Sequence, residues 1–181
     1  VHVKLIATNE RIDIIEQGID LAIRVRHLPL EDSDLVVRGL DAWEHVLVAS
    51  AELFKQNDIP QNLEDLTKLP SIGFNRPKHY WGFRHVSEDK VEQIAFQPRL
   101  KTDSFSTMKT AVLANMGVAS LPRIFVKEEL KSGQLIELCS EWKLPEGVIH
   151  VAYASRQGML PAVRELLNFL IEKFKNLDNI K

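Results

Sequence analysis

The sequence contains a single cysteine, Cys139, among its 181 residues. One thiol excludes an intramolecular disulfide framework and a zinc site built from several cysteines. The charge is nearly balanced, with 23 Lys and Arg residues against 25 Asp and Glu residues, whereas general nucleic-acid binders are distinctly basic. No apolar run approaches the ~20 residues that cross a bilayer, and no basic and apolar leader opens the chain. We therefore expect a soluble, cytoplasmic protein with no membrane partner.

Motifs of the common enzyme classes are also missing. The chain has no nucleophile elbow, no glycine-rich phosphate loop and no metalloprotease helix. Ser50, Ser104 and Ser106 lack an accompanying histidine and acid in a convincing arrangement. His79 and His85 have no carboxylate or cysteine at metal-ligand spacing. We predict that the protein is not an enzyme and that it holds no metal and no cofactor.

The chain does contain two segments in which an apolar-periodic helix leads through glycine into a buried strand. Residues 12–25 pass through Gly18, and residues 108–122 pass through Gly117. Glycine just beyond a helix adopts the left-handed backbone that ends it, and a strand without polar alternation is buried on both faces. Two such units predict two α/β lobes with a crevice suited to a small molecule.

Alternation and apolar periodicity predict the other elements. Extended segments are expected at residues 1–7, 19–25, 35–40, 45–49, 71–74, 79–85, 91–100, 135–138 and 148–154, the segments 79–85 and 91–100 being antiparallel. Helices are expected at 10–17, after Ser50, from Asn62, at 104–117, at 122–131 and from Pro161. In the first of them Ile12 and Ile15 should be buried, and Asn62 with Asp65 should form a capping pair. The aromatic residues at 79–85 could stack on bases, but Trp81 and Phe83 share one strand face, which favours packing.

Several short segments occur in an order that is itself informative. Residues 16–24 are EQGIDLAIR and residues 114–122 are ANMGVASLP. Between and after them stand LVAS at 47–50 with Leu53-Phe54, IP at 59–60 with LEDL at 63–66, WGF at 81–83 and GQL at 133–135. Together they resemble the LysR-type transcriptional regulators along essentially the whole chain. Asn115 stands where that family commonly has glycine, and asparagine tolerates positive φ.

The resemblance implies the fold. The corresponding region of these regulators is the effector-binding domain, an α/β, periplasmic-binding-protein-like fold of two α/β subdomains joined by two crossover strands. Residues 1–40 and 150–181 would form subdomain I and residues 41–149 subdomain II, with the crossovers at about 35–49 and 146–154. Subdomain I is expected to lack its first strand and helix, and the DNA-binding domain is absent from this chain.

Candidate effector-binding residues follow from the same fold. Ligands of open α/β sheets bind beyond the carboxyl ends of strands, and helix N-termini favour anions there. The candidates are Thr8, Asn9, Phe74, Asn75, Arg76, Thr102, Asp103, Ser104 and Phe105. The resemblance implies that Thr8 and the backbone at 74–77 face the effector.

Purely structural interpretations remain open for these residues. Thr8, Asn9 and Ser104 are good helix caps with or without a ligand. Phe74 could belong to the core, and Arg76 could be a solvated loop charge. Outside this set, Arg24 is expected to pair with a carboxylate, and Cys139 to be an inert, partly buried thiol because no resolving cysteine accompanies it.

The resulting expectation is a ligand-sensing and oligomerising domain. It would bind a small effector, plausibly an anion, in the cleft between the lobes, form a homodimer or homotetramer, and act on DNA only through the absent N-terminal winged helix-turn-helix. The alternatives are a fragment of a periplasmic-type solute-binding protein and a small α/β enzyme.

Overall fold

The computed structural model describes residues 1–8, 10, 12–27, 35–55, 57–154 and 159–177. The chain divides into two compact units, which we describe separately. Unit 1 combines residues 1–43 with residues 146–181, and unit 2 is the continuous segment 44–145. The subdomain limits expected from the sequence, 40/41 and 149/150, stay a prediction.

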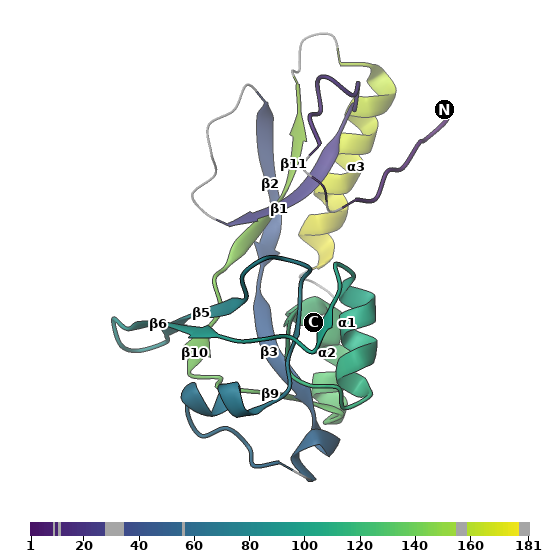
Figure 1. Ribbon diagram of the computed structural model, residues 1–181. Coiled ribbons are helices and arrows are strands. Elements are labelled where there is room, and N and C mark those ends of the chain that lie inside the picture. Colours follow the sequence, from purple (N-terminus) through teal and green to yellow (C-terminus); the bar gives the residue numbers. More distant parts are fainter. Residues whose placement is uncertain (9, 11, 28–34, 56, 155–158, 178–181) are drawn as a thin grey trace. The chain divides into compact units, whose positions relative to one another are not determined.

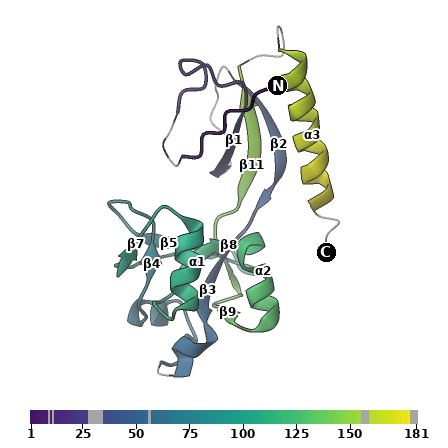
Figure 2. The ribbon, with the colours of Figure 1, turned by 90° about the vertical axis from the view of Figure 1, so that its right-hand side faces the viewer.

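Unit 1 is built on a three-stranded antiparallel sheet (Figure 1). Strand β11 (Gly147–Tyr153) lies in the middle, between β1 (Ala22–His27) and β2 (Val36–Trp43). Helix α3 (Pro161–Leu177) runs beside the sheet (Figure 2), and Leu167 on that helix packs against buried side chains of β11. Pro161 is the first helical residue, as predicted, because its fixed φ suits that position.

The first 25 residues of unit 1 differ from the sequence-based expectation. Val1–Ala7 is exposed and pairs with no strand that the structure describes, so the predicted strand is wrong. An alternating sequence forms a strand only where a neighbour satisfies its backbone groups.

The predicted helix over 10–17 is also wrong, because the described residues form only a turn that ends at Gly18, with φ of +61°. The Asp13 carboxylate accepts hydrogen bonds from the backbone N–H groups of Ile15 and Glu16, at 2.8 and 3.0 Å, which is the bonding of an N-cap. The helical turn therefore begins only at residue 14, and Gly18 ends it before a helix can form. Ile14 is the buried residue of this segment, whereas Ile15 is 59% exposed.

Strand β1 likewise departs from the prediction, since it begins at Ala22 rather than at residue 19. The strand is not buried along its whole length, because Ile23 is 51% exposed. Arg24 donates from Nη2 to the carbonyl oxygen of Ile12 at 2.7 Å, which fastens the start of the strand to the turn before it.

Unit 2 is centred on β3 (His45–Ser50), which lies between β8 (Ala119–Pro122) and β9 (Leu135–Glu137). Side chains alternate across β3. Val46 and Val48 pack toward helices α1 (Phe105–Leu113) and α2 (Arg123–Ser132), whereas Leu47 and Ala49 belong to a cluster that contains Trp81 and Phe83. The buried central strand therefore organises two cores, one on each of its faces.

The second core is covered by the sheet β10 (Trp142–Lys143), β5 (Tyr80–His85) and β6 (Val91–Ala95), in that order. The predicted antiparallel pairing of β5 with β6 is confirmed, as is the shared buried face of Trp81 and Phe83. The expected strand 91–100 is in fact two strands. Its last residue begins β7 (Leu100–Lys101), which pairs in parallel with β4 (Ile72–Gly73).

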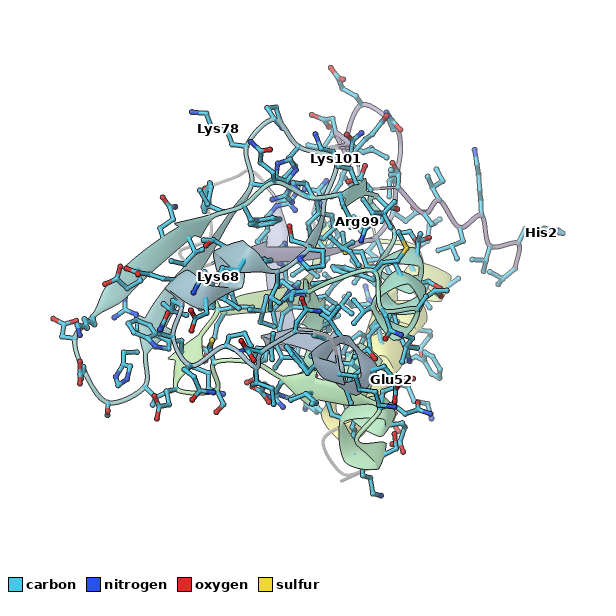
Figure 3. The ribbon with its side chains drawn as sticks, turned by 60° about the horizontal axis from the view of Figure 1, so that its bottom comes forward. His2, Glu52, Lys68, Lys78, Arg99 and Lys101 are labelled. Atoms are coloured by element: carbon cyan, nitrogen blue, oxygen red, sulfur yellow. The ribbon has the colours of Figure 1, made fainter. Side chains whose placement is uncertain are left out.

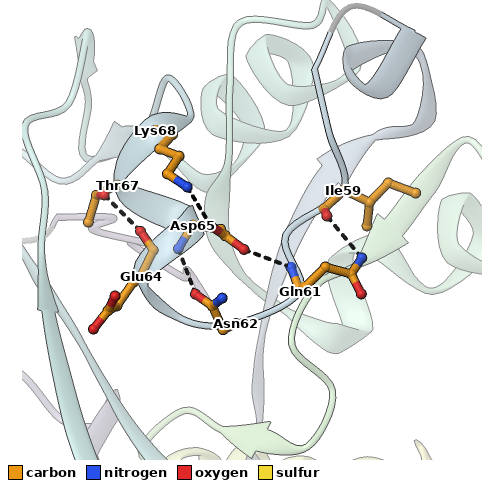
Figure 4. Close-up of polar contacts among 7 residues, drawn as sticks. All are labelled: Ile59, Gln61, Asn62, Glu64, Asp65, Thr67 and Lys68. Carbon is orange, nitrogen blue, oxygen red and sulfur yellow. Dashed lines mark hydrogen bonds and ion pairs between the residues drawn. The ribbon is translucent and has the colours of Figure 1, made fainter.

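Two short 3₁₀ helices complete unit 2, namely η1 (Ala51–Lys55) and η2 (Glu64–Lys68). The capping pair expected before η2 forms in part (Figure 4), although Leu63, the residue directly before the helix, makes no side-chain cap bond. The backbone N–H of Asp65 donates to Asn62 Oδ1 at 3.0 Å, and the Asp65 carboxylate accepts from the N–H of Gln61 at 3.1 Å.

The turn after α1 corrects the role expected for its glycine. Asn115, not Gly117, takes the left-handed conformation, with φ of +62°. Gly117 has φ of +147°, and a Cβ there would lie 2.3 Å from the carbonyl oxygen of Pro70. Glycine is therefore required at 117 because the chain at Pro70 approaches too closely for any side chain.

Candidate functional site

Seven of the nine predicted binding residues come together at one end of unit 2. Strands β4 and β7 are parallel, with Gly73 opposite Lys101. Their carboxyl ends therefore point the same way, and residues 74–76 follow one strand while residues 102–105 follow the other. The parallel pairing, which the sequence did not reveal, is what makes one site of two separate loops.

Backbone hydrogen bonds fix these two loops to each other. The N–H of Thr102 donates to the carbonyl oxygen of Gly73 at 3.0 Å, and the N–H of Asn75 donates to Asp103 Oδ1 at 3.2 Å. The N–H of Arg76 donates to the carbonyl oxygen of Phe74 at 2.9 Å, which closes a tight turn with Asn75 at its tip. The two loops form one connected structure.

Helix α1 begins directly at this site. Ser104 is its N-cap, and Ser104 Oγ accepts from the N–H of Thr107 at 3.3 Å. Thr102 Oγ1 in turn accepts from the N–H of Ser104 at 3.2 Å. The positive end of the helix dipole therefore points toward residues 102–104 and favours a negatively charged group there.

Aromatic rings form the apolar part of the site. The half-buried Phe74 and Phe105 meet edge to face, with ring centroids 5.3 Å apart. Both pack against the core cluster that includes Met108. Arg76 Cζ lies 4.9 Å from the centroid of the Phe74 ring, so the guanidinium is held over an aromatic face. Phe74 therefore belongs partly to the core, as one of the two interpretations of the sequence allowed.

Basic side chains surround these loops. Arg76, Lys78, Arg99 and Lys101 are all exposed, and they come from the turn after β4 and from the strand β7 with the residue before it. Lys78, Arg99 and Lys101 are labelled in Figure 3. Within the two loops the single cation Arg76 accompanies the single carboxylate of Asp103, and Lys78 and Lys101 stand next to the loops in the chain. This excess of positive charge favours an anion.

His79 is a residue that the sequence-based reasoning did not select. Its Nε2 lies 2.9 Å from the carbonyl oxygen of Phe74, and its ring lies 3.1 Å from the position that a Cβ on Gly73 would take. His79 therefore supports the turn on which Arg76 sits. Gly73 at the end of a buried strand was the only signal of this close approach.

The two remaining candidates belong to the first part of the chain. Thr8 is exposed in unit 1, and its Oγ1 accepts from the N–H of Glu10 at 3.1 Å, which is the local bond expected of a capping residue. Asn9 lies outside the described residues. The role of both in binding stays a prediction.

Cys139 is half-buried, as predicted. Burial raises the pKa of its thiol, and the nearby carboxylates of Asp65 and Glu141 raise it further, so the reactive thiolate is disfavoured. Among the described residues, no group of three or more His, Cys, Asp and Glu is placed to hold a metal ion. No described helix is both long and apolar enough to cross a bilayer.

The chain is similar to known regulators over nearly its whole length. Residues 1–175 match the family described as the LysR substrate binding domain. The HTH-type transcriptional regulator PtxR of Pseudomonas aeruginosa is 29% identical over 174 residues, which cover 95% of this chain and 54% of PtxR. The chain therefore spans about half the length of the curated relatives that it matches.

Solved structures agree with the fold. The full-length virulence activator AphB of Vibrio cholerae superposes with a TM-score of 0.84 at 21% identity, over 96% of this chain and 58% of AphB. The regulatory domain of CrgA from Neisseria meningitidis gives a TM-score of 0.73 at 24% identity, over 88% of this chain and 78% of that domain. At such identities the likeness establishes a shared mixed α/β fold.

Proposed function

Because the chain belongs to the LysR substrate binding domain family, we propose that it is the effector-sensing part of a LysR-type transcriptional regulator. The observation that carries this proposal is the family match over residues 1–175. The family consists of transcription regulators, not of enzymes or transport proteins, so the two alternatives expected from the sequence lose their support.

The proposed ligand is a small anion bound beside the N-terminus of α1. The helix dipole, the Arg76 guanidinium and the hydroxyl groups of Thr102 and Ser104 supply positive potential and donors. The half-buried Phe74 and Phe105 supply an apolar surface beside them. This combination suits a carboxylate attached to an apolar body. The binding role expected for Thr8 and Asn9 of subdomain I is part of the same proposal.

Control of transcription would follow from a shift between conformations. A ligand that contacts both subdomains stabilises one arrangement over another, and a difference of ~1–3 kcal/mol per site is enough for regulation. The change would reach DNA through a winged helix-turn-helix domain outside this chain and through the pairing of subunits as a homodimer or homotetramer. We also propose that the whole protein is cytoplasmic, as expected of a transcription regulator.

The test is calorimetry of the 181-residue chain against a panel of small carboxylates, with Arg76→Gln as the variant. We expect saturable binding that the substitution weakens by about tenfold, because one charge-assisted contact is lost. Arg84→Gln is the matched control, because Arg84 is exposed like Arg76 but lies on strand β5, outside the proposed site. A panel without any binder, or equal binding by the two variants, would contradict the assigned site.

A further inference from the structure

The described residues that line one cavity all belong to unit 1. The cavity has a volume of about 270 Å³ and is lined by Arg38, Met159, Arg164, Leu167 and Asn168. Arg38 comes from β2, and the other residues come from α3 and the segment just before it. Figure 2 shows α3 running beside the sheet to which β2 belongs, so the cavity lies where the helix meets an outer strand.

The polar residues of this cavity converge by helix geometry. Arg164 and Asn168 are one turn apart on α3 and therefore project from the same face. Arg38 faces them from the opposing strand. Within the part of the chain that the structure describes, neither guanidinium makes a side-chain hydrogen bond or an ion pair. The described lining of the cavity contains two cations and no carboxylate, and it creates a positive potential that an anion would relieve.

The other described residues of the lining are apolar. Leu167 is only 4% exposed and belongs to the core of unit 1, and the half-buried Met159 packs against the same core. The cavity thus has an apolar side and a basic side. Ligand sites commonly combine an apolar lining with a few convergent polar groups, and their volumes start at about 300 Å³. A cavity slightly below that limit fits only a small molecule.

We propose that this cavity is a second anion site, which binds a short organic carboxylate. The carboxylate oxygens accept from the guanidiniums of Arg38 and Arg164, since arginine pairs with carboxylates in a bidentate geometry. The Asn168 amide donates a further hydrogen bond, and the apolar body of the ligand lies against Met159 and Leu167. Such a ligand joins β2 to α3, and it shares no residue with the site at the N-terminus of α1.

The three methionines allow the two sites to be told apart. Met159 lines the cavity of unit 1, whereas Met108 and Met116 pack in the core of unit 2 beside Phe74 and Phe105. We would label the methionine methyl groups with ¹³C in the 181-residue chain and titrate it separately with acetate, pentanoate and inorganic phosphate. Pentanoate should move the Met159 signal in a saturable manner, with acetate and phosphate binding more weakly because they lack the apolar body.

Substitutions then assign the contacts. Arg38→Gln and Arg164→Gln should each weaken pentanoate binding about tenfold, and Arg38→Lys should restore only part of it because lysine lacks the planar fork. Arg84→Gln is the control variant. Thermal melting verifies that each variant is folded. If Arg38→Gln does not fold, Arg38→Lys, which keeps the charge, takes its place in the comparison. A Met159 signal that fails to move, or that moves equally in the glutamine variants, would overturn the proposal. Phosphate binding as tight as that of pentanoate would contradict the proposal that the ligand is an organic carboxylate.

Discussion

Glu44 and Arg123 hold each other at two points. The Arg123 side chain donates from Nε to Glu44 Oε2 at 2.9 Å, and the Arg123 backbone N–H donates to the Glu44 carbonyl oxygen at 3.0 Å. Arg123 also pairs with Glu137 at 2.8 Å, and Lys143 pairs with Glu44 at 3.0 Å. The four side chains join the residue before β3 to the first residue of α2 and to strands β9 and β10.

Removing the Glu44 charge should therefore destabilise the protein. Glu44→Gln leaves the shape intact but weakens two charge-assisted hydrogen bonds, and we expect a loss of about 1 kcal/mol in the free energy of unfolding because the group is partly exposed. Urea denaturation at neutral pH measures the loss. Glu52→Gln is the control, since its partner Lys55 and Glu52 itself are largely exposed; a change there as large as that at Glu44 would contradict the interpretation.

The same contact predicts a dependence on pH. Burial opposes ionisation of Glu44, but the hydrogen bonds from Lys143 and Arg123 outweigh burial and lower its pKa below the usual value of 4.5. A lowered pKa in the folded state stabilises the fold above the unfolded pKa, and this contribution is lost as pH falls through the folded pKa. The stability difference between the native chain and Glu44→Gln should hence shrink below pH 4.5. Urea titrations at several acidic pH values give the result, and a constant difference would argue against the pairing.

Gly117 should be the least replaceable of the positive-φ glycines in unit 2. An alanine Cβ would lie 2.3 Å from the Pro70 carbonyl oxygen, so Gly117→Ala should cost about 3 kcal/mol because the backbone itself must move. Gly133→Ala is the matched comparison: Gly133 has φ of +76° but open space around it, and its cost should be only about 1 kcal/mol. Denaturation curves of the two variants give the order, and equal costs would contradict the close approach.

Ser104 should contribute to stability and to binding together. Ser104→Ala removes the acceptor for the Thr107 N–H and should cost about 1 kcal/mol, as for other N-caps. Ser132 donates from its hydroxyl to the Glu129 carbonyl oxygen near the end of α2, and Ser132→Ala should change stability by less than about 0.5 kcal/mol. Calorimetry with a carboxylate that binds the native chain would show whether Ser104→Ala also loses affinity, as the proposed site requires.

Local sequence signals predicted the features that local interactions control. The cap at Ser104 and the first turn at Pro161 are each decided by one side chain and its immediate backbone. The buried pair Trp81 and Phe83 followed from strand alternation. These features need no knowledge of distant segments.

Features that depend on distant segments were missed. The alternation of Val1–Ala7 predicted a strand, but a strand also requires a neighbour, and the chain pattern does not reveal one. Glu44 and Arg123 are 79 residues apart and follow no motif. The candidate site shows the same limit: the two loops were found from strand ends and helix caps, whereas the parallel pairing of β4 with β7 that joins them was not.

The central place of β11 has a consequence for folding during synthesis. Strands β1 and β2 pair only with β11 among the described strands of their sheet, yet more than a hundred residues separate β2 from β11 along the chain. The continuous segment 44–145 has all its own contacts once residue 145 leaves the ribosome, whereas the first two strands must wait for residues 147–153. We expect β1 and β2 to be the last of the described strands to become protected, and to depend most on chaperones while they wait.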